Sequence, residues 1–297
     1  MKIREIDVAA IIAAQGGGSD ILINLHLGND TSIAQNERIV IRNGIIIILC
    51  RADSGTIKVD GKEYNLSHNN IIVLPENHII EYVAPIFTQD SNMIAVSVDY
   101  ILNMPSPIDT SILNYSRYIS VLSVGDAKFD DLHSYYKFIY KESQEGCRYQ
   151  SEIIHSIFYA LILEIMAEYE NVLRAEESAK ESTGESADIK DNNLSDRFFR
   201  LLATHYKQYR TVQFYAERLN LTPKYLSTAI KRATGRPMLS WINEAVMIDA
   251  KMLLRTTDLT VQQLSEMLNF SSPSAFVQFF RKHTTTTPHL YRRRFNK

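Results

Sequence analysis

The chain contains one short motif twice. TVQFYAERLNL occupies residues 211–221, and TVQQLSEMLNF occupies residues 260–270, 49 residues further along. The two stretches agree in Thr, Val, Gln, Glu, Leu and Asn at equivalent positions, and each ends on a large apolar residue. A stretch that recurs in this way predicts one small structural unit that is used twice. We therefore interpret the C-terminal third as a duplicated structure.

The first copy predicts two helices joined by a short turn. Apolar residues recur at helical spacing up to Asn220, which ends the first helix. In the segment that follows, Thr222 is a good N-cap, Pro223 suits the first helical position, and Gly235 is a typical C-terminal stop. The residues expected to face inward are Val212, Tyr215, Ala216 and Leu219 in the first helix, and Leu226, Ile230 and partly Tyr225 in the second.

Polar side chains line the outer face of this second helix at positions i, i+3, i+4 and i+7. They are Lys224, Ser227, Thr228 and Lys231. Two helices joined by a short turn, the second with such an exposed stripe, form the helix-turn-helix unit that places a recognition helix in the major groove of DNA. One unit alone is a weak signal, because most two-helix turns only serve packing.

The second copy repeats the arrangement with different side chains. Asn269 and Phe270 make the turn, Ser271 or Ser272 caps the next helix, and Pro273 opens it. The residues expected to face inward are Val261, Leu264, Met267 and Leu268 in the first helix, and Phe276, Phe279 and Phe280 in the second. The outward candidates for DNA contact are Ser274, Gln278, Arg281 and Lys282, of which the last two, with YRRRF at residues 291–295, suit phosphate groups.

A third helical pattern, PMLSWINEAVMIDAKMLLRTT, joins the two copies. It predicts a helix of about 19 residues, which is ~28 Å long at 1.5 Å per residue. One turn of B-DNA measures about 34 Å, so a rigid helix of this length can set two recognition helices into successive major grooves. The residues available for burial in this helix are Trp241, Ile242, Ala245, Ile248, Met252 and Leu253.

The charge of the chain is unevenly distributed. Residues 194–297 hold 17 Lys and Arg against 6 Asp and Glu, a net charge of +11, whereas residues 1–193 hold 15 against 28, a net charge of −13. A basic third of this kind is typical of a domain that binds a polyanion such as double-stranded DNA. Between the two parts, residues 174–193 have almost no large apolar side chain, and we interpret them as a linker between domains at 1–173 and 194–297.

Residues 195–295 resemble the DNA-binding domain of the AraC/XylS family of bacterial transcription regulators. The resemblance lies in AERLNLTPKYLSTAIKRATG, in DAKMLL and in LSEMLNFSSPSAFVQFFRKHTTTTPHLYRRRF. Three positions depart from the family pattern, because Asn269 and Thr285 stand where glycine is usual and Val246 stands where many members have Arg. Asn tolerates a left-handed backbone, so the turn at Asn269 is expected to survive. The resemblance implies a transcription regulator, an activator, with RNA polymerase as a partner.

The N-terminal part is predicted to be rich in strands. Residues 39–99 read as short strands broken by turns, and TIKVDGKEYNL predicts a hairpin with Asp60 and Gly61 as its two-residue turn. Such a series of strands favours a small β-barrel or sandwich. The resemblance implies a cupin-like sensing domain, so the predicted fold class is α+β, with an N-terminal cupin-like β-barrel and a C-terminal all-α double helix-turn-helix domain.

Two helices are expected after the strands, at residues 130–143 and 150–173. The second has an apolar face too wide for burial on one side alone. The resemblance implies a homodimer formed through residues 151–173, and a fully intramolecular core remains the alternative. Two further alternatives stay open: a small-molecule effector binds in the barrel, or the barrel only dimerises.

Catalytic and metal-binding signals are weak. A metal-dependent cupin enzyme would need clustered ligands, but the candidates His26, His68 and His78 are isolated in sequence and form no HxH pair. Cys50 and Cys147 have no CxxC spacing. We expect no enzymatic activity, no cofactor and no metal. The opening residues favour an amphipathic helix over a signal peptide, and no apolar stretch is expected to approach the ~20 residues of a membrane span, so we expect a cytoplasmic protein without membrane contact.

Overall fold

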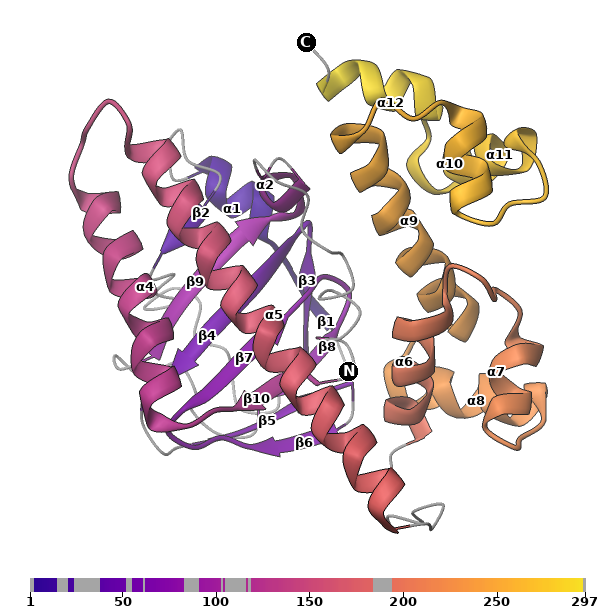
Figure 1. The fold of residues 1–297 in the computed structure, drawn as a ribbon, viewed down its shortest axis with the longest axis horizontal. Coiled ribbons are helices and arrows are strands. Elements are labelled where there is room, and N and C mark those ends of the chain that lie inside the picture. Colours follow the sequence, from indigo (N-terminus) through magenta and orange to yellow (C-terminus); the bar gives the residue numbers. More distant parts are fainter. Residues whose placement is uncertain are drawn as a thin grey trace. The chain divides into compact units, whose positions relative to one another are not determined.

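The computed structural model describes residues 3–14, 21–23, 38–51, 55–60, 62–82, 91–102, 104, 116, 119–183 and 194–295 (Figure 1). The chain divides into two compact units. The first contains the strands and the two long helices that follow them, and the second contains the helices from Leu194 onward. The mixed α+β class predicted from the sequence is confirmed, with sheets in the first unit and helices in the second.

The first unit is built on two five-stranded sheets. One sheet has the order β1 (Ile3–Asp7), β3 (Arg38–Arg42), β8 (Ile79–Tyr82), β5 (Thr56–Val59) and β6 (Lys62–Asn65). The other has the order β10 (Val121–Ser123), β7 (Asn70–Leu74), β4 (Gly44–Cys50), β9 (Ser91–Ser97) and β2 (Ile21–Ile23). The described strands form two separate sheets and not a closed barrel, so the predicted cupin-like barrel is not confirmed.

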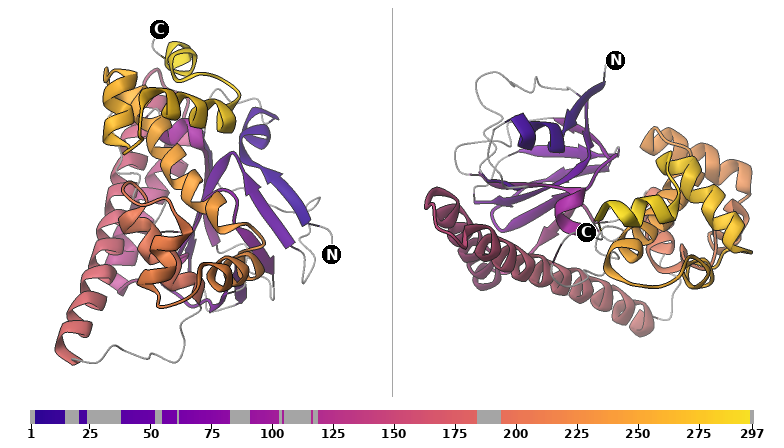
Figure 2. Two further views of the ribbon diagram at one scale, coloured as in Figure 1. Left: turned by 90° about the vertical axis from the view of Figure 1, so that its right-hand side faces the viewer. Right: turned by 90° about the horizontal axis from the view of Figure 1, so that it is seen from above.

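Strand β4 shows why the sheets need a further layer. All seven of its residues, GIIIILC, are buried, whereas the residues of β6 alternate between half-buried and exposed. Ile46 and Ile48 belong to the core between the two sheets. Because side chains alternate along a strand, Ile45 and Ile47 point to the opposite face. Helices α4 (Asp126–Gln144) and α5 (Gln150–Thr183) cover that face (Figures 1 and 2).

The N-terminal residues differ from the predicted single helix. They begin with strand β1, which pairs in parallel with β3, and only Val8–Ala14 form helix α1. The side chain of Asp7 accepts a hydrogen bond from the Ala10 amide at 3.0 Å, so the helix starts there. The hairpin at Asp60 is confirmed, since β5 and β6 pair antiparallel with Val59 opposite Lys62.

Helix α5 is longer than the sequence predicted. It ends at Thr183, ten residues into the segment 174–193 that we interpreted as a linker. That segment has no apolar face, but its Arg, Ala, Glu and Lys residues are good helix formers. Arg174 also forms an ion pair with Glu170 at 3.1 Å, one turn earlier. A lack of apolar residues therefore excluded burial here, but not helix.

By length and composition alone, α5 is also the one described helix apolar enough to cross a membrane. The segment Gln150–Ala175 has a mean hydropathy of 1.2, so the expectation that no such stretch exists was wrong. In the structure, part of this helix is buried in the first unit. The buried side chains are Ile154, Phe158, Leu161, Ile162, Ile165 and Tyr169.

The second unit consists of seven helices among the described residues. They are α6 (Leu194–His205), α7 (Val212–Arg218), α8 (Pro223–Thr234), α9 (Met238–Thr256), α10 (Val261–Met267), α11 (Pro273–Thr284) and α12 (Pro288–Phe295). Helix α9 runs between the group α6–α8 and the group α10–α12 (Figure 1). Each group has an aromatic core, with Trp241 buried in the first and Phe276 and Phe280 buried in the second.

Candidate nucleic-acid interface

The first helix-turn-helix unit is formed by α7 and α8, and local chemistry sets its ends. The Thr222 hydroxyl accepts a hydrogen bond from the Tyr225 amide at 3.3 Å, with Pro223 as the first helical residue. Gly235 ends α8 with φ 71°, and Asn220 holds the turn with φ 55°. The predicted cap, start, stop and turn of this unit are confirmed.

The second unit, α10 and α11, uses the same scheme. Ser272, and not Ser271, caps α11 by accepting a hydrogen bond from the Ala275 amide at 3.1 Å. Asn269 has φ 54° and Thr285 has φ 61°. Both residues that replace the family's usual glycine therefore adopt the left-handed backbone, as expected for Asn269.

The four predicted residues of α8 lie on its outer face. Lys224, Thr228 and Lys231 are exposed and Ser227 is half-buried, whereas Leu226 and Ile230 are buried. The Thr228 hydroxyl donates a hydrogen bond to the Lys224 carbonyl at 2.9 Å.

Tyr225, expected partly inward, is 56% exposed, so that expectation was wrong. It lies on the first turn of α8 and about 100° around the helix from the buried Leu226.

The four predicted residues of α11 are also together on one exposed face. Ser274, Gln278, Arg281 and Lys282 are exposed, while Phe276 and Phe280 are buried beneath them. The prediction failed for Met267 in α10, which is 54% exposed instead of packed. It is the last residue of a seven-residue helix, where Leu264 and Leu268 already fill the core.

Helix α9 has the predicted length of 19 residues and buries most of its predicted face. Trp241, Ile242, Ala245 and Ile248 are buried, and the Trp241 indole donates a hydrogen bond to the Thr234 hydroxyl at 3.0 Å. Val246 is fully buried as well, so the position where many family members have Arg contributes to the core here.

Two elements of this unit were not predicted. Helix α6 packs through Phe198 and Phe199 on Tyr215 and Trp241, and α12 packs through Tyr291 on Phe280. Their apolar residues at helical spacing were the available signal for both helices.

The isolated histidines of the first unit have other partners. His68 Nδ1 lies 2.7 Å from the Arg51 carbonyl oxygen, and buried His78 Nδ1 lies 2.6 Å from Asp60 Oδ2. His26 lies outside the described residues. Over the residues that the structure describes, no group of three or more His, Cys, Asp or Glu side chains could hold a metal ion.

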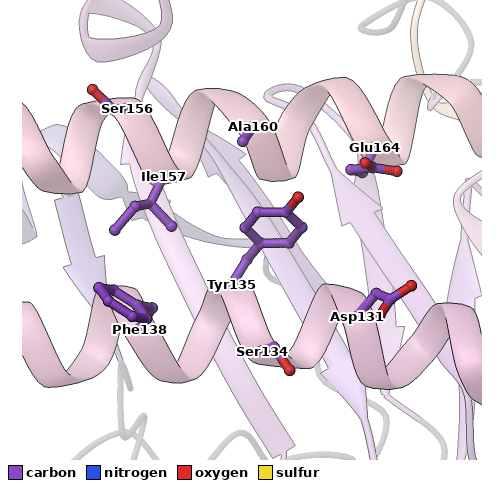
Figure 3. Close-up of a pocket in the computed structure, with 8 residues that line it drawn as sticks. All are labelled: Asp131, Ser134, Tyr135, Phe138, Ser156, Ile157, Ala160 and Glu164. Carbon is purple, nitrogen blue, oxygen red and sulfur yellow. The ribbon is translucent and has the colours of Figure 1, made fainter.

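A groove of ≈ 550 Å³ lies between α4 and α5 (Figure 3). Its lining residues are Asp131, Ser134, Tyr135, Phe138, Ser156, Ile157, Ala160 and Glu164. Phe138 is 52% exposed there, and Glu164 forms an ion pair with Lys128. The hydrogen bond to Glu164 raises the pKa of the Lys128 ammonium group. Half of the lining comes from the helix predicted to dimerise.

Comparison with known proteins concerns the second unit. A family described as a helix-turn-helix domain matches residues 215–294. YtdP, an HTH-type transcriptional regulator of Bacillus subtilis strain 168, is 28% identical over 106 residues, which are 36% of this chain and 14% of that protein. The regulatory protein PocR of Salmonella typhimurium strain LT2 is 29% identical over 98 residues, 33% of this chain and 32% of that protein. The chain thus spans about a third or less of these two relatives.

A solved structure covers the same part. The C-terminal domain of the two-component response regulator yesN from Fusobacterium nucleatum is 29% identical, and the match covers 34% of this chain and 99% of that chain with a TM-score of 0.32. The family match and the named regulators agree with the two capped units described above. Residues 215–294 are therefore a DNA-binding helix-turn-helix domain of the AraC/XylS type.

Proposed function

We propose that the protein is a sequence-specific transcription regulator in which one chain reads two adjacent segments of double-stranded DNA. The observation that carries the proposal is the pair of capped helix-turn-helix units, each with an exposed polar face on its second helix, joined by the 19 residues of α9. A helix of that length is ~28 Å long. One DNA turn is about 34 Å, so α8 and α11 suit successive major grooves.

The exposed residues divide into two roles in this proposal. Those with short or amide-bearing side chains, and Lys224 on the first turn of α8, contact base edges. The basic residues further along each helix contact phosphates and add affinity without sequence preference. The base contacts are Lys224, Ser227, Thr228, Ser274 and Gln278, and the phosphate contacts are Lys231, Arg281 and Lys282.

The first unit serves dimerisation and sensing in this proposal. Support for a homodimer through residues 151–173 comes from the groove between α4 and α5, where Phe138, Tyr135 and Ile157 leave apolar surface open to solvent. By the family resemblance, the regulator is a cytoplasmic activator that works with RNA polymerase. A thermal-shift screen tests whether an effector binds a cupin-like first unit, because a ligand that binds only the folded protein raises the melting temperature as its concentration exceeds its dissociation constant.

The two-segment proposal is tested by footprinting. Full-length protein selects its preferred sites from random double-stranded DNA, and the chosen site is then cleaved in the presence of the protein. We expect two protected major-groove segments per chain with centres about 10 base pairs apart. Protection of one such segment per chain would contradict the proposal, and so would an absence of any selected sequence.

The dimer is tested separately by sedimentation. Phe138→Ser removes the most exposed apolar side chain of the groove, and Tyr149→Ser removes a 60% exposed aromatic outside it as the matched control. We expect a dimer for the wild type and the control, and monomers for Phe138→Ser. A monomeric wild type, or a dimer that survives in Phe138→Ser, counts against this interface.

A further inference from the structure

The two helix-turn-helix units are joined by more than helix α9. The segment 206–210, which connects α6 to α7 in the first unit, is held against α9. The Tyr206 hydroxyl donates a hydrogen bond to Asp249 Oδ2 at 2.7 Å, and Lys207 Nζ lies 3.2 Å from the same oxygen. Asp249 is almost fully buried, so both contacts compensate a charge that burial would otherwise penalise. The start of the segment is therefore firmly placed on α9.

The same segment reaches the turn of the second unit. The Asn269 side-chain amide donates a hydrogen bond to the Gln208 carbonyl at 2.9 Å. The Arg210 guanidinium carbon lies 3.7 Å from the centre of the Phe270 ring, which is a close cation–π contact. Burial lowers the pKa of Arg210 to about 10, so the group stays charged at neutral pH. These two contacts join residues about 60 positions apart.

Both ends of this connection are anchored in the cores of their units. On one side, the Tyr209 ring stacks on Phe214 with centres 3.8 Å apart, and the Tyr215 hydroxyl donates a hydrogen bond to the Tyr209 carbonyl at 2.8 Å. On the other side, Phe270 packs against Phe276 and Phe279 at 5.2 and 5.1 Å. The segment 206–210 therefore connects the aromatic cores of the two units through its contacts with Asn269 and Phe270.

We propose that segment 206–210 with Asn269 and Phe270, here named the clasp, fixes the angle between the two units and thereby sets the spacing of the two DNA segments that the protein accepts. The inference rests on the proposed reading of two segments. One added base pair moves the second segment by about 3.4 Å and turns it by about 35°, since a turn holds about 10 base pairs. A rigid pair of units rejects such a site, whereas units joined by α9 alone adapt to it.

Asn269 is a positioning residue in this proposal, and the duplication supplies its control. Asn220 occupies the equivalent turn position of the first unit with nearly the same φ, 55° against 54°. Within the described part of the chain, the Asn220 side chain makes no hydrogen bond, whereas Asn269 bonds to Gln208. Glycine accepts this backbone more readily than Asn does. Asn220→Gly and Asn269→Gly therefore both keep the fold, and only the second removes a clasp contact.

The first measurement requires no DNA. In the full chain, the exposed Cys147 is replaced by Ser, and spin labels are placed at Arg232→Cys on α8 and Gln262→Cys on α10, both exposed positions. We expect one narrow distance distribution for the parent and for Asn220→Gly. In Asn269→Gly combined with Arg210→Met, the distribution should broaden. Distance distributions of equal width in the parent and in this double variant would show that the clasp does not fix the angle between the units. This result does not depend on which DNA the protein binds.

The second measurement uses the selected DNA site and two versions with one base pair added or removed between its segments. The parent and Asn220→Gly should lose about 30-fold or more in affinity on the altered spacings. The double variant should bind the selected spacing about five-fold more weakly and discriminate by less than about five-fold. Broadened distances with unchanged discrimination overturn the role in spacing. A parent that selects no DNA refutes the proposed function instead, and leaves the label result to decide on the clasp.

Discussion

The two helix-turn-helix copies adopt the same backbone conformations at their turns and helix ends, but with different side chains. Both turns place an Asn at φ near 55°, but α8 ends on Gly235 and α11 ends on Thr285. Both first helices begin at a Thr, but only Thr260 forms a reciprocal capping box with Gln263. The exposed faces also differ, with Lys224 and Thr228 in one and Ser274 and Gln278 in the other. The shared motif therefore specifies the backbone and leaves the exposed faces of α8 and α11 free to diverge.

The largest effect should come from truncating the two aromatic cores. Trp241→Ala and Phe276→Ala each remove a fully buried ring, so each should lower the free energy of unfolding by about 3–5 kcal/mol. Trp241→Ala also leaves the Thr234 hydroxyl without its indole donor. Denaturant unfolding followed by circular dichroism measures both. Met267→Ala is the matched exposed control with little change, and a loss below about 1 kcal/mol in either core variant would show that its unit is not held by that ring.

The next effect concerns the residues that we propose to contact DNA. Gln278→Ala should cost about 1–3 kcal/mol at particular base pairs, because an amide side chain can form paired hydrogen bonds to a base edge. Arg281→Ala should instead weaken binding to all sequences alike and reduce the salt slope by about one. Competition binding on single-base variants of the selected site separates the two. An unchanged sequence preference in Gln278→Ala would remove this residue from the base contacts.

Substitutions at the residues that end α8 and α11 should change the free energy of unfolding in opposite directions. Gly235→Ala places a β-carbon at φ 71° and should destabilise by about 1 kcal/mol. Thr285→Gly removes the β-carbon from the equivalent left-handed position at the end of α11 and should stabilise the protein by a similar amount. Melting temperatures measure both. Destabilisation by Thr285→Gly would mean that the threonine side chain contributes more than its backbone costs.

The smallest effect should distinguish the two N-terminal caps. Thr260→Ala removes the bond of 3.2 Å from the Gln263 amide to the Thr260 hydroxyl and should cost about 1 kcal/mol. The other bond of the capping box, from the Thr260 backbone amide to the Gln263 side chain at 2.8 Å, remains. Thr211→Ala should cost less, because the Thr211 hydroxyl accepts from the Phe214 amide at only 3.5 Å. Chemical denaturation of the two variants in parallel gives the difference. Equal losses would show that the shorter bond to the Thr260 hydroxyl stabilises no more than the 3.5 Å bond to the Thr211 hydroxyl.

Sequence reasoning succeeded where neighbouring residues decide the structure. Thr222, Pro223 and Gly235 specify the bounds of α8 through contacts within one turn, and Asn269 could be assigned a left-handed backbone from its residue type. Sequence reasoning failed where contacts between distant segments decide which side chains are buried, as for Tyr225 and Met267, which are exposed. The clasp depends on a contact between Asn269 and Gln208 across 61 positions, which no local pattern reports.

The first unit shows the same limit. The strands could be predicted from runs of apolar residues. Their division between two sheets could not, because it depends on pairing between distant segments. Helix α5 could not be bounded correctly because its last ten residues form helix without an apolar face.

Trp241 is the only tryptophan of the chain, and it lies on α9, fully buried against Phe199 of α6. Tryptophan fluorescence therefore reports on the aromatic core that α9 forms with the group α6–α8. The sheets and the group α10–α12 contribute none of it. The Arg236 guanidinium, 4.1 Å from the ring, makes the emission sensitive to movement at the C-terminal end of α8. The fluorescence of Trp241 can therefore follow DNA binding or unfolding in this part of the protein separately from the group α10–α12.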